Sequence, residues 1–323
     1  MLEFQHKIGF GGAGLGNLLR PMEPETAWQL CDEAWENGIR YFDTAPHYGL
    51  GLSEIRLGDF LRTRKRAEYR ISTKVGRVLE PVDNPRGLLD LGADFHVRAD
   101  YRRRPDYTPE GVNRSITDSL ERMGLDHVDI AFVHDPEKAN IGMHAALEQG
   151  ISALDRLKDQ GTIGSVGVGS MSAEALEAAL EIGGIDTLMV AGRYTLLEQP
   201  ALEVLDRAAR TGVEVVFASV FNSGLLARPT PSPNDRYEYA TVPHEVFERA
   251  VELARICSRY DVELPAAALQ FPLRHPAGSA LIAGIDAPGQ CIENIARLNA
   301  PIPEELWAEL QYLGLIPEVT ARD

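Results

Sequence analysis

Short apolar runs alternate with amphipathic stretches along the whole chain, and this alternation constrains the fold more than any other feature. The runs that read as strands span residues 39–43, 70–74, 128–133, 163–168, 187–190, 214–218 and 280–283. A glycine-rich apolar segment, residues 8–15, is a further candidate for the first strand. The stretches that read as helices span residues 25–37, 53–63, 108–123, 145–159, 173–181, 199–210, 243–260 and 288–298.

Repeated strand–helix units of this kind fold either as a closed (β/α)8 barrel or as an open doubly wound sheet. An open dinucleotide-binding sheet needs a helix that begins directly after its glycine-rich turn, so that the helix N-terminus holds a pyrophosphate. Here residues 20–24, Arg-Pro-Met-Glu-Pro, delay that helix. We therefore predict an α/β fold, a (β/α)8 TIM barrel, with residues 1–323 forming a single domain.

Two long segments interrupt the regular spacing. Residues 76–107 contain several prolines and show no clear period, and residues 222–242 are rich in Pro, Ser and Asn. In a barrel, long loops of this kind usually cover the C-terminal mouth and hold substrate; the alternative is a solvated surface excursion. The first segment is also rich in arginine: Arg77, Arg86, Arg98, Arg102, Arg103 and Arg104.

Polar side chains stand at the ends of three successive strand-like runs. Asp43 ends the first run and Tyr48 follows five positions later; Lys74 ends the second run, and His134 ends the third. A strand buried on both faces is normally apolar, so a carboxylate at its end needs a partner. Because the C-terminal ends of barrel strands converge on one mouth, we expect these four residues to meet in space.

Together the four residue types suit proton transfer to or from an oxygen. A Lys74 ammonium beside Tyr48 favours the phenolate and lowers the phenol pKa, and Asp43 keeps the lysine charged. His134 can orient a substrate oxygen. This combination fits the interconversion of a carbonyl and an alcohol by hydride transfer. Taken singly, each residue has a structural reading: a strand-end histidine is usually a satisfied core residue, and Asp43 can cap the following turn.

Charge and composition exclude several other classes. A formal net charge of −16 disfavours binding to nucleic acid or to an anionic membrane. No apolar run approaches the roughly 18–20 residues that span a bilayer, and the first ten residues lack the layout of a signal peptide. Three cysteines are scattered without a metal-site or disulfide pattern. These observations predict a cytoplasmic protein without a metal.

Several segments together resemble the aldo-keto reductase superfamily, and the resemblance covers nearly the whole chain. They are YFDTAPHYGLGLSE (41–54), STKVG (72–76), RSITDSLERMGLDHVDIAFVH (114–134), VHDPE (133–137), IGSVGVGS (163–170) and AGIDAPGQCIENI (283–295). The resemblance implies a barrel that binds NAD(P)(H) without a Rossmann fold, and a catalytic tetrad at Asp43, Tyr48, Lys74 and His134.

The sequence of residues 45–54 most resembles the aldose 1-dehydrogenase group of that superfamily. This resemblance implies an enzyme that oxidises an aldose-type hemiacetal or alcohol to a lactone, with Tyr48 as general acid/base; L-fucose, D-arabinose and pyridoxal are example substrates. One alternative is an aldehyde or ketone reductase that uses the same tetrad. Another is a non-catalytic NAD(P)H-sensing subunit. A metal-dependent hydrolase would need clustered ligands, and His134 with Asp135 is too little.

The same resemblance implies the cofactor-binding residues. Ser170 takes the place of a residue that holds the nicotinamide carboxamide, and the loop after the seventh strand covers the pyrophosphate. The aromatic residue that stacks on nicotinamide in the family is absent after that strand, with Phe217 or Phe221 as substitutes. Residues 284–294 contain no Lys or Arg to bind a 2′-phosphate, so NAD is the preferred form of NAD(P). The full set is Ser170, Ser219, Phe221, Ser223, Gly284, Asp286, Gln290, Glu293 and Asn294.

The substrate is expected to be a small sugar, aldehyde or alcohol. His47 and Arg193 are the predicted substrate contacts, although His47 can equally be an exposed turn residue and Arg193 can equally pack against Glu198. Phe10 and Asp135 are further candidates. Neither nucleic acid nor a membrane is expected as a partner.

Overall fold

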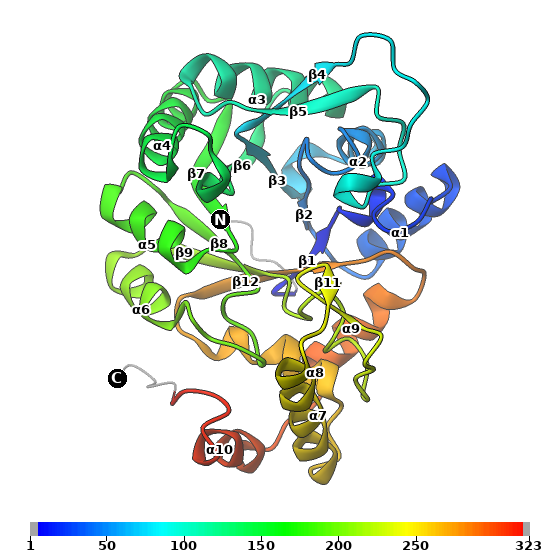
Figure 1. Ribbon diagram of the computed structural model, residues 1–323, viewed down its shortest axis with the longest axis vertical. Helices are drawn as coiled ribbons and strands as arrows, with labels where there is room; N and C mark the ends of the chain where they lie inside the picture. The colour runs from blue at the N-terminus through cyan, green and yellow to red at the C-terminus, as the bar shows by residue number, and fades with distance from the viewer. Residues whose placement is uncertain (1–5, 319–323) are drawn as a thin grey trace.

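The computed structural model describes residues 6–318 and contains the predicted closed barrel of parallel strands (Figure 1). The strands follow one another around the barrel in the order β1, β2, β3, β6, β7, β8, β9 and β12, after which β12 pairs with β1. The predicted fold class is therefore confirmed. The predicted domain, residues 1–323, extends beyond the described residues at both ends. The strand bounds are Ile8–Gly11 (β1), Tyr41–Asp43 (β2), Arg70–Val75 (β3), Val128–His134 (β6), Ile163–Ser170 (β7), Thr187–Ala191 (β8), Glu214–Ala218 (β9) and Gly278–Gly284 (β12).

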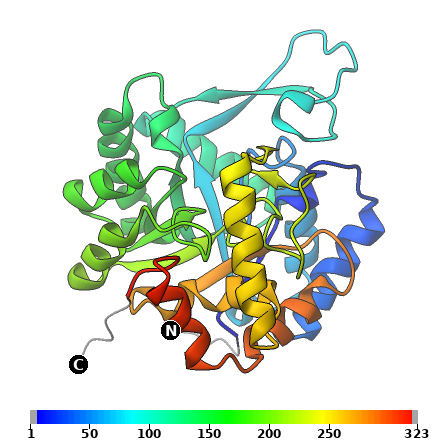
Figure 2. The ribbon, with the colours of Figure 1, turned by 60° about the horizontal axis from the view of Figure 1, so that its bottom comes forward.

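Helices surround the strand ring, and those predicted from hydrophobic periodicity are present within a few residues of the expected bounds (Figures 1 and 2). Two further helices, α8 and α10, were not predicted. The helix bounds are Pro24–Glu36 (α1), Leu52–Leu61 (α2), Pro109–Met123 (α3), Met143–Asp159 (α4), Ala173–Ile182 (α5), Leu202–Thr211 (α6), His244–Arg259 (α7), Leu264–Gln270 (α8), Gln290–Asn299 (α9) and Glu304–Tyr312 (α10).

The glycine-rich segment after β1 does not form a dinucleotide-binding turn. Gly9, Gly11 and Gly14 have the G-x-G-x-x-G spacing, but they lead into a short 3-10 turn, Gly14–Gly16, and α1 begins only at Pro24. Because no helix N-terminus follows the glycines directly, nothing there is built to receive a pyrophosphate. The closed barrel, rather than an open sheet, agrees with this local structure.

Side chains alternate between two apolar layers along each strand. Inside the barrel, Tyr41, Ile130, Phe132 and their neighbours Met189, Val216 and Ile282 form a compact cluster. The residues between them, such as Phe42, face outward and join the larger core under the helices. This period of two matters for function, since it decides which residues at the strand ends point into the mouth.

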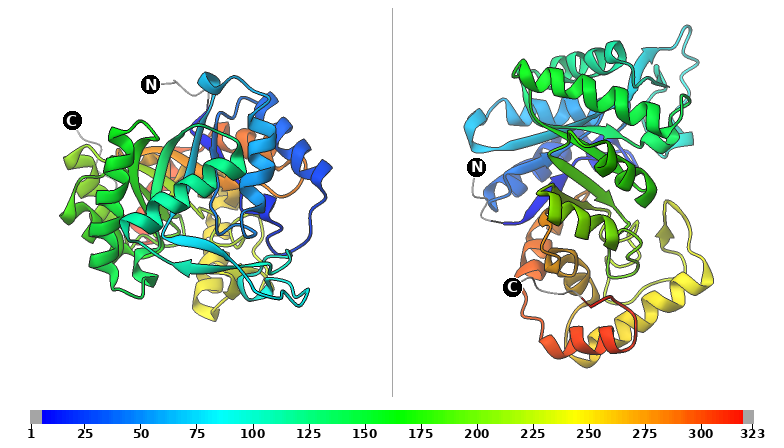
Figure 3. Two further views of the ribbon diagram at one scale, coloured as in Figure 1. Left: turned by 90° about the horizontal axis from the view of Figure 1, so that it is seen from above. Right: turned by 90° about the vertical axis from the view of Figure 1, so that its left-hand side faces the viewer.

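The two long segments each contain a hairpin, and both hairpins project from the same side of the barrel (Figure 3, right). In the first, β4 (Arg77–Pro81) pairs with the antiparallel β5 (Tyr101–Pro105), so residues 76–107, for which we expected no regular structure, begin and end in a sheet. In the second, β10 (Arg236–Tyr237) pairs with β11 (Ala240–Thr241). Arg236 lies 3.6 Å from Asp94 of the first segment, so the two excursions meet.

All three cysteines, Cys31, Cys257 and Cys291, are buried and unpaired. Burial raises the pKa of each thiol to about 12. Within residues 6–318 no helix is long and apolar enough to cross a membrane, and no group of three or more potential ligand side chains could hold a metal ion.

Candidate active site

Strand alternation directs the predicted strand-end residues into the barrel mouth. On β2, Asp43 lies two positions after the inward-facing Tyr41; on β6, His134 lies two positions after the inward-facing Phe132. On β3, Lys74 pairs in register with Phe132 and also faces inward. The structure therefore brings Asp43, Lys74 and His134 together above the inner apolar cluster.

Lys74 is the centre of a buried polar network. Its Nζ donates to Asp43 Oδ2 at 2.6 Å and to the Thr44 carbonyl at 2.9 Å. The other oxygen of Asp43 accepts from the Ser72 hydroxyl at 2.6 Å. The side chains of Lys74 and Asp43 are only 2% and 3% exposed, so the pair is shielded from solvent. Tyr48 lies beside this amine, because the Lys74 Nζ is 4.7 Å from the centroid of the Tyr48 ring.

The electrostatics of this network agree with the prediction for Lys74 and differ from it for Tyr48. Burial lowers the pKa of Lys74, but Asp43 and Tyr48 together outweigh burial and raise it, so the amine stays charged. Burial raises the pKa of Tyr48, and Lys74 opposes this shift without reversing it. Lys74 thus lowers the phenol pKa as expected, but the net shift is upward, because the protein packed around the hydroxyl stabilises the neutral phenol more than the ammonium stabilises the phenolate.

Close backbone contact and a hydroxyl relay hold Tyr48 in place. Gly49 has a φ of +62°, and a Cβ there would lie 2.3 Å from the Gly16 carbonyl oxygen, so both positions need glycine. After β2, the hydroxyls of Thr44 and Ser53 are 2.8 Å apart, and Ser53 donates to the Gly12 carbonyl at 2.7 Å. The turn that carries the phenol is thus fixed against the segment following β1.

Two histidines face each other at the mouth, and both are held neutral. The ring centroids of His47 and His134 are 6.0 Å apart. Burial lowers the pKa of both, and the nearby Arg77 guanidinium lowers both further. The Nδ1 atom of His47 is buried and has no hydrogen-bond partner among the described residues. His47 is therefore an inward-facing residue with one free polar atom, rather than an exposed turn residue.

The first long segment supplies residues to the site that we did not single out from the sequence. Phe95, 2% exposed, packs its ring edge-on against His47 with centroids 5.4 Å apart, and lies 6.4 Å from Tyr48. Arg103 donates to the His47 carbonyl at 2.8 Å and binds both oxygens of Asp90. The arginine-rich composition pointed to this segment as a whole but could not indicate which side chain turns inward.

Next to His134, a cluster of charges surrounds Asp135. Its carboxylate pairs with Arg77 and with Lys138, the latter at 3.0 Å, and lies 3.9 Å from His134 Nε2. Tyr107 donates to the backbone carbonyls of His134 and Asp135. Arg77 and Tyr107 flank the first excursion, so this hairpin is anchored at its base to the strand that carries His134.

On the opposite side of the mouth, the predicted cofactor residues at the ends of β7 and β9 have protein partners of their own. Ser170 donates to Glu137 Oε2 at 2.8 Å and accepts from the Ser172 amide. Ser219 and Ser223 both have positive φ, +55° and +59°, in a tightly turned loop. Phe221 is partly buried and packs against the outer core.

The proposed substitute aromatic Phe217 does not reach the mouth. Its side chain is fully buried in the outer core and stacks on Tyr194, with centroids 5.8 Å apart. The inward positions beside it on β9 are Val216 and Ala218. Phe217 is therefore excluded as a residue that contacts a ligand in the mouth.

The turn between β12 and α9 is rich in hydrogen-bond acceptors. Gln290 Oε1 accepts from the amides of Asp286 and Ala287, while Gln290 Nε2 donates to Asp286 Oδ1 at 2.9 Å. The Gly289 amide, at the N-cap of α9, donates to both carboxylate oxygens of Glu33, at 3.1 and 3.0 Å. A carboxylate from α1 thus occupies the position where a helix N-terminus would favour an anion.

A basic residue also reaches this turn, which the local sequence did not show. Arg20, from the segment before α1, donates to the Asp286 carbonyl at 2.9 Å and lies 3.5 Å from its carboxylate. Of the remaining predicted residues here, Gly284 is exposed, Asn294 is buried, and Glu293 is exposed and lies 3.4 Å from Arg297.

Arg193, a predicted substrate contact, is engaged mainly within the protein. It pairs with Glu198 at 3.3 Å and with Glu238 of the second hairpin. Phe10, a further predicted substrate contact, is fully buried in the outer core, which excludes it from that role.

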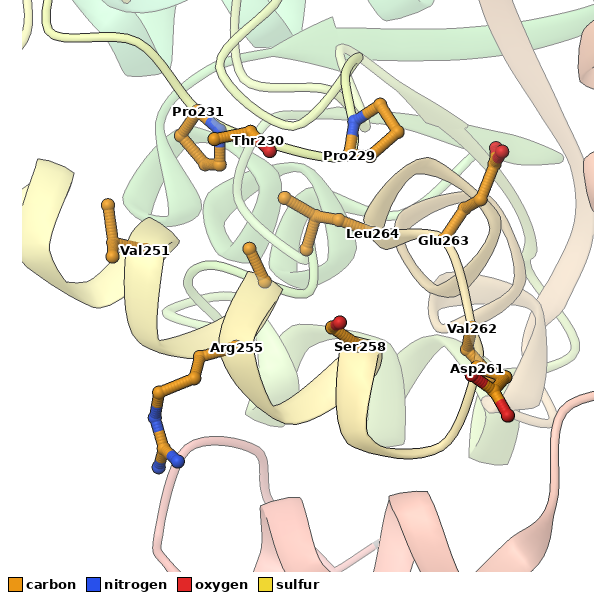
Figure 4. A pocket seen from close by; sticks show the side chains of 11 residues that line it. Pro229, Thr230, Pro231, Val251, Arg255, Ser258, Asp261, Val262, Glu263 and Leu264 are labelled. Atoms are coloured by element: carbon orange, nitrogen blue, oxygen red, sulfur yellow. The ribbon is translucent and has the colours of Figure 1, made fainter.

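A separate hollow of about 480 Å³ lies between residues 229–231, α7 and the start of α8 (Figure 4). Its lining includes Val251, Arg255 and Leu264, and none of the predicted site residues. The mouth, and not this hollow, carries the chemistry-bearing side chains.

The mouth has the polar groups that a nicotinamide dinucleotide requires. The acceptors of the β12–α9 turn, Asp286 and Glu33, suit the hydroxyl donors of a ribose better than a phosphate. Tyr48 and His47, whose Nδ1 has no hydrogen-bond partner among the described residues, lie next to each other with ring centroids 6.1 Å apart. These groups fit the binding of a nicotinamide dinucleotide.

Comparison with known proteins agrees with the fold and identifies the family. The profile of the Aldo/keto reductase family matches residues 7–314. The chain is 47% identical to a D-threo-aldose 1-dehydrogenase of Pseudomonas sp., over 96% of this chain and 94% of that protein. It is 38% identical to a pyridoxal 4-dehydrogenase of Microbacterium luteolum, again over 96% and 94%. Among solved structures, an aldo-keto reductase of Bacillus halodurans in its holo form superimposes with a TM-score of 0.73 and 24% identity, over 95% of this chain and 91% of that one.

Proposed function

The chain belongs to the aldo/keto reductase family and is an NAD(P)-dependent oxidoreductase; from this premise we propose that it oxidises the C1 hydroxyl of an aldose in its cyclic hemiacetal form to the lactone. L-fucose and D-arabinose are the substrates of first choice. The observation that carries the proposal is the buried Asp43–Lys74 ion pair, whose Nζ lies 4.7 Å from the centroid of the Tyr48 ring.

In this reaction the C1–O–H proton passes to Tyr48 while the C1–H bond breaks. Bound NAD⁺ supplies the acceptor for the hydride that leaves C1. For this step Tyr48 must first have released its own proton to solvent, because the neutral phenol that burial favours cannot accept another. Lys74 stays protonated because Asp43 holds its charge, so it stabilises the Tyr48 phenolate that accepts the C1 hydroxyl proton. His134, neutral and beside Tyr48, with ring centroids 6.5 Å apart, orients the C1 oxygen. Phe95 and the first hairpin exclude water from one side of this centre.

The name of the second relative favours pyridoxal as an alternative substrate. Pyridoxal also forms a cyclic hemiacetal, and its oxidation to a lactone uses the same proton and hydride positions. A third possibility is that the same residues reduce an aldehyde or ketone, with Tyr48 as the proton donor.

The substrate is tested by the formation of NADH at 340 nm, measured with L-fucose, D-arabinose and pyridoxal as separate substrates. The expected result is turnover of an aldose, and its loss by about 10² to 10⁴-fold in Tyr48→Phe, the range typical for removal of a general acid or base. Tyr312→Phe, at an 89% exposed position, is the matched control. If only pyridoxal is oxidised, pyridoxal and not an aldose is the substrate. If the enzyme neither oxidises these compounds nor reduces their aldehyde analogues, the proposed function is refuted.

We further propose that NAD⁺ is preferred over NADP⁺. The support is the acceptor-rich β12–α9 turn: Glu33 occupies the amide of Gly289, and Asp286 faces the same turn, so a 2′-phosphate would meet negative charge there. Arg20 is the one cation found beside Asp286 among the described residues, and its side chain is 59% exposed. The measurement is kcat/KM for both cofactors; a higher value with NADP⁺ would overturn this preference.

A further inference from the structure

The second hairpin is held in a backbone conformation that most residues avoid. The two residues at its tip, Glu238 and Tyr239, have φ values of +49° and +64°. Two-residue hairpin loops with positive φ at both positions favour Asn-Gly, because side chains with a Cβ resist this region. Such a conformation persists where surrounding contacts determine it, and these contacts set the direction in which the tip points.

Contacts with the loops after β8 and β9 hold the hairpin. Glu238 forms an ion pair with Arg193, and the Tyr237 hydroxyl donates to Glu198 Oε1 at 2.9 Å. The Tyr239 amide donates to Ser223 Oγ at 3.1 Å. The hairpin is therefore fixed at the tip and along β10, on the side of the barrel where the strands end (Figures 1 and 3).

The phenol of Tyr239 points from this tip toward the catalytic residues. The residue as a whole is 46% exposed, because it stands at the end of a hairpin. Its hydroxyl interacts electrostatically with Tyr48, Asp135 and Lys74, while its backbone amide is fixed to Ser223 in the loop after β9. Tyr239 thus stands on the β9 side of the mouth, within electrostatic reach of the proton-transfer residues.

No residue of β9 itself points a ring into the mouth. The inward residue at the end of the strand is the small Ala218, and Phe217 and Phe221 pack against the outer core. An aromatic face suits the C–H face of a sugar ring, and a phenol hydroxyl suits a sugar hydroxyl.

We propose that Tyr239 forms the outer wall of the substrate site, with its ring packed on the substrate ring and its hydroxyl hydrogen-bonded to a substrate hydroxyl. This inference rests on the proposed function, because it takes the substrate to be a cyclic hemiacetal. Tyr239 contacts the substrate and takes no part in proton transfer, so its removal weakens substrate binding more than it slows the chemical step.

The test compares Tyr239→Ala, Tyr239→Phe and the matched control Tyr312→Ala, which removes an 89% exposed tyrosine of α10. For each, KM and kcat are measured with the aldose that the wild type oxidises best, and Kd for NADH is measured by fluorescence in the absence of sugar. Tyr239→Ala is expected to raise KM about tenfold or more, to change kcat less than about threefold, and to leave the NADH Kd within about twofold. Tyr239→Phe keeps the ring and is expected to restore most of the affinity.

A fourth variant, Glu238→Gln, keeps the tyrosine but weakens the ion pair with Arg193 that holds the tip. It is expected to raise KM by an intermediate factor. Unchanged KM in Tyr239→Ala overturns the proposal, as does a KM increase matched by an equal loss of NADH affinity, which would make Tyr239 a cofactor contact. If Tyr239→Phe is as poor as Tyr239→Ala, packing of the ring on the substrate is refuted.

Failure of the proposed function would be visible separately, in the wild type. If the wild type oxidises no aldose but reduces an aldehyde or oxidises pyridoxal, the proposed function fails, and the same ratios of variant to wild-type KM are then measured with that substrate. Tm of each variant is measured alongside, and a variant that melts far below the wild type is replaced by Glu238→Gln as the test of the same contact.

Discussion

On the β2–β6 arc of the mouth, formed by Asp43, Tyr48, Lys74 and His134, charged groups are buried and satisfy one another. On the β7–β12 arc, formed by Ser170, Ser219, Asp286 and Gln290, Ser170 is buried, and the other three polar side chains are partly accessible. Lys74 and Asp43 are joined at 2.6 Å with almost no solvent contact. Asp286 instead faces the 59% exposed Arg20 at 3.5 Å.

The difference follows from what each arc has to do. A proton-transfer group must hold its charge state in every encounter with substrate, so the β2–β6 arc is rigid, shielded and internally paired. In the function that we propose, the β7–β12 arc binds a cofactor that must enter and leave, which suits loops whose contacts can be remade. Substitutions on the first arc should therefore affect both chemistry and stability, and substitutions on the second should affect binding alone.

The largest effect is expected for Lys74→Met on the β2–β6 arc. The variant leaves Asp43 buried without its cation and removes the charge beside Tyr48, so kcat should fall by about 10³-fold or more. The free energy of unfolding should fall by about 3 kcal/mol, since breaking a buried ion pair leaves an uncompensated charge. Steady-state kinetics and urea unfolding measure the two losses. A double variant, Asp43→Asn with Lys74→Met, should regain stability but not activity; recovery of neither would place the lost stability elsewhere.

A large pH effect on stability should also originate on this arc. The pKa of both His47 and His134 is lowered in the folded protein, so below the ordinary value of 6.5 these residues take up protons only on unfolding. Stability is therefore complete above pH 6.5 and declines as the pH falls, by about 2 kcal/mol per histidine at pH 5.

Urea unfolding at pH 7 and pH 5 tests this effect, with the double variant His47→Gln and His134→Gln for comparison. The wild type should lose more stability than the variant between the two pH values. Another partly exposed histidine, His144, serves as the control in His144→Gln. Equal losses in wild type and double variant would mean that other groups cause the acid sensitivity.

A smaller effect is expected on the β7–β12 arc from Glu33→Gln. Removal of the carboxylate at the Gly289 amide should raise kcat/KM with NADP⁺ relative to NAD⁺ by about tenfold, because one charge near a phosphate at the protein surface is worth ~1 kcal/mol or slightly more. Glu36→Gln, an exposed position on the same helix, is the control and should leave the ratio unchanged. If the ratio of kcat/KM with NADP⁺ to kcat/KM with NAD⁺ is unchanged in Glu33→Gln, the 2′ position of the adenosine ribose lies away from this turn.

The smallest effect is expected for Gln290→Ala. Its side chain links Asp286 and Ala287 to the start of α9, so its loss should loosen the turn and raise KM for NAD⁺ about threefold, the value of one net hydrogen bond. The turnover number and Tm should stay close to wild type. A fall in kcat as large as the rise in KM would contradict the separation between the two arcs.

The barrel and the β2–β6 arc could be predicted from the sequence because both depend on local pattern. Strand alternation and the convergence of parallel strand ends are enough to place Asp43, Lys74 and His134 in one mouth. The direction of the Tyr48 pKa could not be predicted in the same way, because it depends on how much protein surrounds the hydroxyl. Helix α8 was missed for a related reason: six of its seven residues are buried, so it has no polar face to show a helical period.

The contacts of the β7–β12 arc could not be predicted because they join distant segments. Glu33 and Gly289 are 256 positions apart, and no local pattern pairs them. Phe95 and Tyr239 lie on excursions whose paths depend on tertiary contacts, so their inward direction has no periodic signature. The reading of Phe217 as a ligand-facing aromatic failed because the strand register places it on the outer side of β9.

The burial of Cys31, Cys257 and Cys291 has a practical consequence for studying the loops. The thiolate is the form that reacts with maleimides and disulfides, and thiols with a pKa of about 12 are almost entirely protonated at pH 7. A cysteine introduced at the exposed Leu88, at the far end of the first hairpin segment, would therefore be the site that a fluorophore labels. Because the three native cysteines do not react with the label, a single introduced cysteine can report the movement of a hairpin, and the native cysteines need not be replaced first.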